Sequence, residues 1–139
     1  NRGFMWMKTL DIFRDFNLWR KLFGAGPDTY YYLFQPYFGE LAQLTDRWVT
    51  STNTAHNEYL HYLVTIGFLG TAAYITALIS AVIYGLKNLS KNPTGAIYLA
   101  AMICYGTQAL VSIAQPITTP LMIIFLALTV SSTKNDPHP

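Results

Sequence analysis

Two long stretches without charge, in the second half of the chain, constrain the fold more than any other feature. Residues 59–86 contain no Asp, Glu, Lys or Arg, and the same holds for residues 95–114. A helix that crosses a bilayer needs about 20 predominantly apolar residues. Only 12% of the chain is charged, whereas soluble domains carry about 25%. The sequence therefore predicts an all-α membrane protein.

We expect three transmembrane helices, at about residues 59–86, 95–114 and 117–131, followed by a tail at 133–139. The third stretch is slightly shorter than the lower limit of about 17 residues for a spanning helix. Small residues spaced four apart in the first stretch predict a face on which another helix packs closely; they are Ala73, Ala77, Ala81 and Gly85.

The distribution of Lys predicts the orientation of these helices. Cytoplasmic loops are enriched in Lys and Arg, and Lys87, Lys91 and Lys134 lie in the first connection and the tail. Three spans would then place residues 1–58 outside the cytoplasm. We also expect this chain to be the C-terminal part of a longer membrane protein, because it does not start with Met and has no charged leader before a short apolar core.

The first 58 residues are richer in charge and in aromatic side chains. Helical spacing of apolar residues predicts one helix, or two short ones, between Phe4 and Phe23. The segment Gly24–Asp28 would end it, since glycine permits positive φ and proline fixes the next turn. We expect another short helix at residues 40–49 and a polar loop at residues 50–54.

His56 is the strongest candidate for chemistry. We predict that it lies in the first turn of a helix capped by Asn53 or Thr54. The positive end of the helix dipole would disfavour the imidazolium form and leave a ring able to accept a proton. The alternative is an interfacial histidine bonded to the loop backbone. A zinc site is not expected, because His56 and His61 are five apart and turn roughly 140° from each other on a helix.

Four arginines in the first 58 residues are candidates for binding an anion, because guanidinium matches the geometry of phosphate oxygens: Arg2, Arg14, Arg20 and Arg47. Solvent or lipid headgroups are the alternative partners of each. Gly24 and Gly26 could form a turn that cradles a phosphate, although neither a P-loop nor a dinucleotide motif is present. A plain turn is the alternative.

Other classes of function are disfavoured. The net charge of +2 is too small for a nucleic-acid-binding surface. The single cysteine excludes an internal disulfide and a Cys-based zinc site. We expect no metal and no cofactor.

Three segments together resemble the signature of the O-antigen ligase and polymerase family. His56-Asn57 precedes Gly67-Phe68-Leu69-Gly70 at the spacing of the family's histidine and GxxG elements. Arg2 and Trp6 are similar to its Arg-xxx-Trp segment, which opens a large extracytoplasmic loop. Leu22–Tyr30, LFGAGPDTY, is similar to its GxGPxxF-type segment, with Tyr30 at the aromatic position.

This resemblance implies the C-terminal part of a multi-pass, GT-C-like helical bundle in the bacterial inner membrane. The activity would be glycosyl transfer or polymerisation from an undecaprenyl-pyrophosphate-linked donor to a glycan or lipid acceptor. His56 would activate the acceptor hydroxyl and Arg2 would hold the pyrophosphate, while we assign Asn57, Gly24, Gly26 and Arg47 to substrate binding. The alternative function is a non-enzymatic transporter or flippase component, which the absence of Asp, Glu, Lys and Arg from the spans disfavours. A third is an adaptor that docks partners through the aromatic loop, for which His56 would be dispensable.

Overall fold

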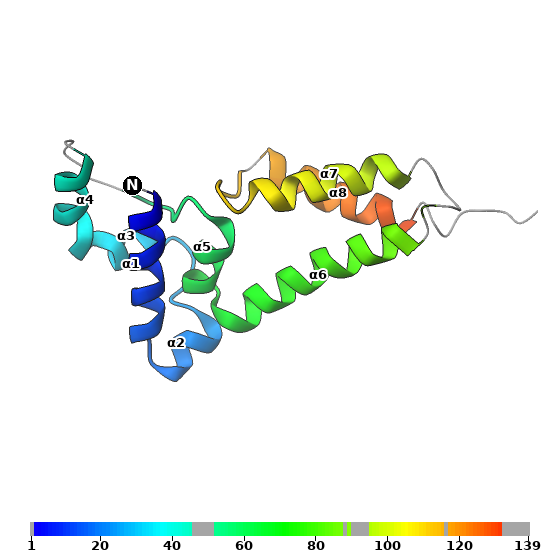
Figure 1. Ribbon diagram of the computed structural model, residues 1–139. Coiled ribbons are helices and arrows are strands. Elements are labelled where there is room, and N and C mark those ends of the chain that lie inside the picture. Colours follow the sequence, from blue (N-terminus) through cyan, green and yellow to red (C-terminus); the bar gives the residue numbers. More distant parts are fainter. Residues whose placement is uncertain (1, 46–51, 88, 90–94, 116, 132–139) are drawn as a thin grey trace, which may run out of the picture. The chain divides into compact units, whose positions relative to one another are not determined.

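The computed structural model describes residues 2–45, 52–87, 89, 95–115 and 117–131, and within these ranges every regular element is a helix (Figure 1). The elements are α1 (Arg2–Asp15), α2 (Leu18–Phe23), α3 (Tyr30–Phe34), the 3-10 turn η1 (Gln35–Tyr37), α4 (Phe38–Thr45), α5 (Glu58–Thr65), α6 (Gly67–Lys87), α7 (Gly95–Gln108) and α8 (Thr118–Ser131). The all-α prediction is therefore confirmed for the described part of the chain.

The chain divides into two compact units, which are described separately. The first contains residues 1–73 and 110–113, and the second contains residues 74–109 and 114–139. Helix α6 begins in the first unit and continues into the second. Arg47, Lys91 and Lys134, which figured in the sequence predictions, lie outside the described residues.

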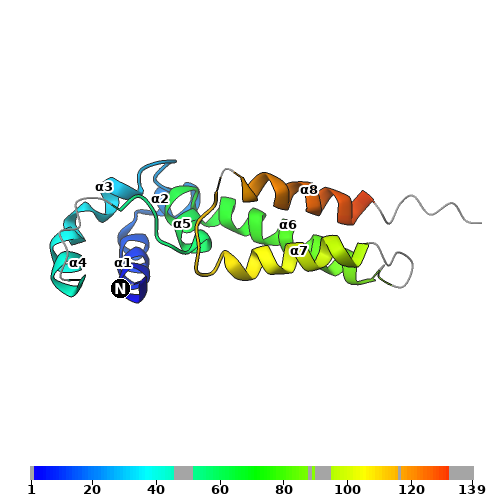
Figure 2. The same cartoon turned by 90° about the horizontal axis from the view of Figure 1, so that it is seen from above.

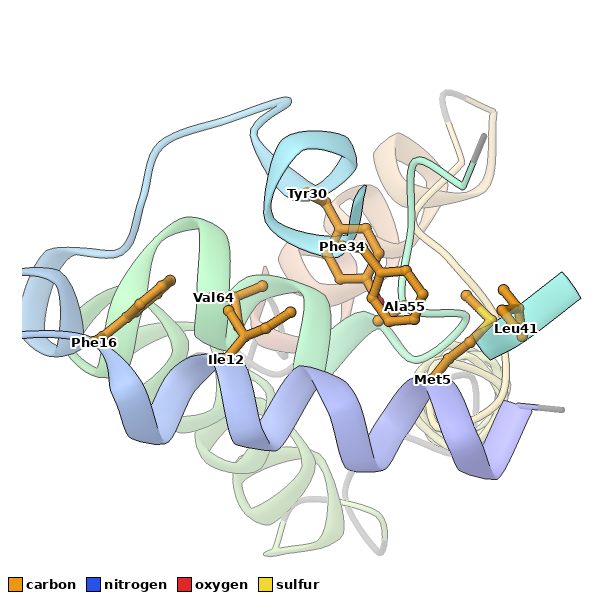
Figure 3. Packing of buried hydrophobic residues seen from close by; sticks show 8 residues of the cluster. All are labelled: Met5, Ile12, Phe16, Tyr30, Phe34, Leu41, Ala55 and Val64. Atoms are coloured by element: carbon orange, nitrogen blue, oxygen red, sulfur yellow. The ribbon is translucent and has the colours of Figure 1, made fainter. Parts of the chain in front are cut away.

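The first unit is built around an aromatic and aliphatic core. Helices α1, α3 and α5 pack against one another, and their inward side chains meet in Figure 3. The fully or nearly fully buried members are Met5, Ile12, Phe16, Tyr30, Phe34, Leu41, Ala55 and Val64. Burial of this apolar surface is the main force that holds these short helices, because isolated helices of this length are marginal in water.

The region predicted as one helix or two, between Phe4 and Phe23, contains two. Helix α1 ends at Asp15, and Asn17 caps α2 because its side chain accepts a hydrogen bond from the Arg20 amide at 2.9 Å. An Asn in extended conformation favours a new helix start over continuation of the previous one.

The helix predicted from Tyr59 to Leu86 is two helices in the structure. Helix α5 ends at Thr65, and α6 begins at Gly67, which has a φ of +74°. Left-handed φ interrupts a right-handed helix, and glycine adopts it without steric cost. Only α6, among the described helices, is long and apolar enough to cross a membrane.

In the second unit, α7 and α8 run side by side in opposite directions (Figure 2). The Tyr98 and Phe125 rings stack at 6.2 Å, and the Tyr105 and Thr119 hydroxyls lie 2.9 Å apart. Helix α7 ends at Gln108 rather than at Ala114 and has 14 residues. Helix α8 also has 14 residues. Both are shorter than the roughly 20 residues of a typical span, and the three-span topology stays a prediction.

The predicted small-residue face is present at its C-terminal half. Ala81 is buried, and a Cβ on Gly85 would lie 2.8 Å from the Thr129 methyl of α8 and 3.1 Å from Leu99 of α7. Gly85 therefore permits the close approach of these helices. Ala73 and Ala77 are exposed in the structure.

Candidate functional site

The three segments that carry the predicted motifs meet in the first unit. Helix α1, which contains Arg2 and Trp6, packs on α5, and α2 and α3, on either side of the glycine-rich segment, also contact α5. Tyr30 lies at the centre of this arrangement. Its hydroxyl is 2.8 Å from the Thr9 hydroxyl of α1, and its ring lies 5.3 Å from the His61 imidazole of α5. The motifs are thus adjacent in space as well as ordered in sequence.

His56 has a strained backbone between two fixed neighbours. Its φ is +50°, in the left-handed region that L-residues rarely adopt. Ala55 before it is fully buried, and Asn57 after it is nearly so. The His56 side chain itself is partly exposed. Such strain persists only where the surrounding structure determines it, and it is most frequent at functional sites.

Two hydrogen bonds fix these neighbours. The Trp6 indole N–H donates to the Ala55 carbonyl oxygen at 3.1 Å. The Asn57 side-chain oxygen accepts from the Leu60 amide at 3.0 Å and so caps α5. The Trp6 bond joins the Arg-xxx-Trp segment to the residue before His56.

The predicted cap of this helix was wrong. Asn57, rather than Asn53 or Thr54, is the N-cap of α5, so His56 lies just before the cap and outside the first turn. The sequence offers three asparagine or threonine residues within five positions, and propensity does not distinguish them.

Arg2 lies one helical turn before Trp6, on the same face of α1. Its guanidinium is exposed and donates one hydrogen bond to the Val111 carbonyl oxygen at 3.0 Å. A guanidinium has five N–H donors, so this bond leaves four for other acceptors. By contrast, Arg14 at the far end of α1 pairs with Asp11 at 2.8 Å.

The glycine-rich segment is a cap on α5. The Ala25 and Gly26 amides donate to the carbonyl oxygens of Val64 and Thr65, each at 2.9 Å, and the Gly24 amide donates to Arg20. The last carbonyls of a helix have no partner within it and carry partial negative charge. These amides already donate to main-chain carbonyl oxygens and face the C-terminus of α5. The segment therefore has the geometry of a plain turn, the alternative to a phosphate-binding turn.

Gly24 and Gly67 form a close main-chain contact. A Cβ on Gly24 would clash with the Thr65 carbonyl and the Gly67 amide, and a Cβ on Gly67 would clash with the Leu22 carbonyl and the Gly24 amide. Both have positive φ, +80° and +74°. From the sequence, Gly67 was identified only as the first glycine of the GxxG element, and this role was missed. The sequence pattern identifies Gly24 and Gly67 as notable glycines, but it does not predict that their main chains are in contact.

Burial perturbs two titratable side chains near the centre of the unit. It raises the pKa of Tyr30 to about 12, and the hydrogen bond with Thr9 opposes part of that shift. Burial also lowers the pKa of His61, and the carboxylate of Asp28 partly opposes it. Among the described residues the buried His61 Nδ1 has no hydrogen-bond partner, which disfavours a charged ring further.

Glu58 is a buried carboxyl that the sequence interpretation missed. It is the first residue of α5 and is almost fully buried. Burial, and then the charge of Glu58, raise the pKa of Tyr59. The available signal was an acidic residue in the first turn of a helix, where the dipole stabilises it.

The described residues define a helical protein with one helix long and apolar enough to span a membrane, and with a unit that contains the strained His56. A sequence profile of the O-antigen ligase family matches residues 1–75, more than half of the 139-residue chain. The chain therefore belongs to the O-antigen ligase family, a family of bacterial inner-membrane proteins of polysaccharide biosynthesis with glycosyltransferase-like activity. No curated protein and no solved structure matches it.

Proposed function

We propose that this chain carries part of the active site of a membrane glycosyltransferase that takes its glycan from an undecaprenyl-pyrophosphate carrier. The observation that carries the proposal is the strained His56, held between buried residues by the Trp6 bond to Ala55 and the Asn57 cap. The acceptor is a second glycan or a lipid-linked core, since both offer the hydroxyl that the chemistry needs.

His56 is the proposed general base. It would take the proton of the acceptor hydroxyl as that oxygen attacks the anomeric carbon. The new C–O bond forms while the bond from this carbon to the pyrophosphate oxygen breaks. An imidazole suits this role near neutral pH. The partial exposure of His56 leaves the ring accessible to an acceptor.

Arg2 is the proposed partner of the leaving group. The pyrophosphate gains charge as it departs, and an exposed guanidinium stabilises that charge. Because Arg2 and Trp6 share a face of α1, and Trp6 contacts the residue before His56, the arginine lies on the side of α1 that faces the histidine loop.

The remaining assigned residues take different roles in this proposal. Asn57 acts by capping α5 behind His56, and Gly24 and Gly26 act by holding the end of α5. Arg47 lies outside the described residues and is kept as a proposed contact of the substrate. Residues 1–58 are proposed to lie outside the cytoplasm, where the lipid-linked donor is presented.

The test is replacement of His56 by Ala in the full-length protein, with surface polysaccharide and the amount of membrane-inserted protein measured together. We expect polysaccharide to disappear while the protein level is kept. The matched control is Asn53→Ala, an exposed neighbour on the same loop, which should leave polysaccharide unchanged. Normal polysaccharide from the His56 variant would refute the proposed base.

The proposed role of Arg2 is tested by comparing two alanine variants on helix α1. Arg2→Ala should reduce transfer at least tenfold, because it removes a charged hydrogen-bond donor from the leaving group. Arg14→Ala is its control, since both side chains are exposed and Arg14 bonds Asp11. Equal activity of the two variants would exclude a role for Arg2 in holding pyrophosphate.

A further inference from the structure

Helix α2 exposes nearly all of its apolar side chains. Leu18 is 73% exposed, Trp19 71% and Phe23 55%, and no residue of the helix is buried. The Trp19 and Phe23 rings meet edge to face at 4.9 Å. Isolated apolar residues are common on protein surfaces, but a cluster of this kind marks an interaction surface. We call Leu18, Trp19, Arg20, Lys21 and Phe23 the α2 patch.

The charged members of the patch are both basic. Arg20 and Lys21 lie in its last turn, and the Arg20 guanidinium is 6.0 Å from the centre of the Phe16 ring. The nearby acid Asp15 is exposed, and Arg14 is paired with Asp11. Tryptophan is enriched at both membrane–water interfaces, and Lys and Arg there lay their stems along apolar surface while their charges stay at the headgroups. Protein interfaces are enriched in Trp, Phe and Arg but depleted in Lys, so Lys21 is the member of the patch that favours lipid over protein as its partner.

The patch adjoins the start of the membrane helix. Phe23 is followed by Gly24, whose main chain is in direct contact with Gly67, the first residue of α6. Figure 1 shows α2 beside the beginning of α6. A helix of 21 residues is about 31 Å long, close to the roughly 30 Å of the hydrocarbon core. If α6 spans the membrane, its first residue therefore lies at one membrane surface, and so does the α2 patch.

We propose that the α2 patch binds the lipid bilayer at the surface where α6 enters it. Leu18, Trp19 and Phe23 lie in the boundary between headgroups and acyl chains, and Arg20 and Lys21 bind anionic phospholipid headgroups. This contact holds the first unit against the membrane in addition to the connection through α6. The proposal does not depend on the chemistry assigned to His56.

Spin labels measure the depth of the patch. The full-length protein, with Cys104→Ser as background, is labelled through L18C or through L44C and placed in nanodiscs that contain phosphatidylglycerol. Leu44 is the matched control, because it is a 56% exposed leucine on α4 of the same unit. We expect the label at position 18 to be several-fold more accessible to oxygen than to an aqueous nickel chelate, relative to the label at position 44.

Two further experiments test separately the headgroup contact of Arg20 and Lys21 and the apolar contact of Trp19. Arg20→Gln with Lys21→Gln, or nanodiscs of phosphatidylcholine alone, should make the label at position 18 shallower. Brominated lipids should quench the fluorescence of the wild-type protein more than that of the Trp19→Phe variant. This second measurement needs no label, and Trp19 is exposed, so its replacement should leave the fold intact.

Three results would overturn the proposal. A label at position 18 that is as accessible to the nickel chelate as the label at position 44 would place the patch in water. A label shielded from both reagents would show that protein covers the patch instead of lipid. If the label at position 18 lay equally deep with and without the Arg20→Gln and Lys21→Gln changes, Arg20 and Lys21 would not bind headgroups.

Discussion

At the residue scale, the most informative position is His56. A left-handed backbone costs an L-residue roughly 1–2 kcal/mol, and here it falls on the histidine that the family resemblance singles out. The strain does not come from His56 itself. It is imposed by the buried Ala55, whose carbonyl binds Trp6, and by Asn57, which starts α5. His56 is therefore positioned by its neighbours, and its own side chain stays partly exposed.

Trp6 should act as a positioning residue for His56. Trp6→Phe keeps an aromatic ring but removes the donor to Ala55, a bond worth about 0.5–1.5 kcal/mol. We expect glycan transfer to fall about two- to tenfold, with the loss in kcat rather than in KM for the donor. Met7→Leu, which changes an exposed side chain of the same helix, should leave kcat unchanged. A Trp6→Phe enzyme with wild-type kcat would contradict this assignment.

His61 should make stability depend on pH. Burial lowers its pKa in the folded state below the usual 6.5, so as pH falls from 6.5 the unfolded chain binds a proton first. Stability is therefore full above pH 6.5 and is lost as pH decreases towards the folded pKa. Thermal unfolding between pH 7.5 and 5 should show this loss.

The control for His61 is its neighbour Asp28. His61→Gln should flatten the acid limb of the stability profile. Asp28→Asn removes the carboxylate that favours the charged ring, so it should steepen the same limb, and asparagine tolerates the φ of +56° at this position. Identical profiles for the wild type and both variants would show that His61 does not control acid stability.

At the element scale, periodicity and charge predicted that helices form but not where one of them breaks. The run from Tyr59 to Leu86 contains no Asp, Glu, Lys or Arg, and the break at Gly67 depends on a main-chain contact with Gly24, which is remote in sequence. In the same way, the glycine-rich segment was recognised as a turn, whereas its function as a cap for α5 requires three-dimensional contacts.

Alanine at either of these glycines should be severely destabilising. The new Cβ meets main-chain atoms that cannot rotate away, and the backbone is left-handed at both sites. We expect Gly24→Ala and Gly67→Ala each to lower stability by more than about 2 kcal/mol, measured as thermal unfolding in detergent. The first unit should lose structure before α7 and α8 do.

Two other glycines provide matched controls. Gly3 and Gly39 lie within helices α1 and α4, and a Cβ at either would meet no atom within 4 Å. Gly3→Ala and Gly39→Ala should be neutral or stabilising by up to about 1 kcal/mol, because alanine favours a helix. If all four variants unfolded alike, the Gly24–Gly67 contact would have no special importance.

At the scale of the whole molecule, the resemblance of short motifs identified the family correctly, and the profile match over residues 1–75 confirms it. The order of motifs along the chain was visible in the sequence. Their convergence around Tyr30 was not, because it depends on how α1, α3 and α5 pack. Glu58 was missed for the same reason, since burial is a property of the folded unit.

The orientation of the chain is testable by cysteine labelling. With Cys104→Ser as background, N53C should react with a membrane-impermeant maleimide in intact spheroplasts, because we propose that residues 1–58 lie outside the cytoplasm. K87C, at the other end of α6 and also exposed, should react only after lysis. The opposite pattern would invert the proposed topology and place His56 on the cytoplasmic side.

The contact between Gly24 and Gly67 also limits how this protein can vary. The contact between Gly24 and Gly67 is formed by main-chain atoms, so its geometry does not depend on the size of a side chain. We expect the junction between α5 and α6 to change more with insertions or deletions in the connecting segments than with substitutions outside this contact. Loop length, rather than residue type, is thus the variable that engineers would have to change to move the His56 loop relative to α6.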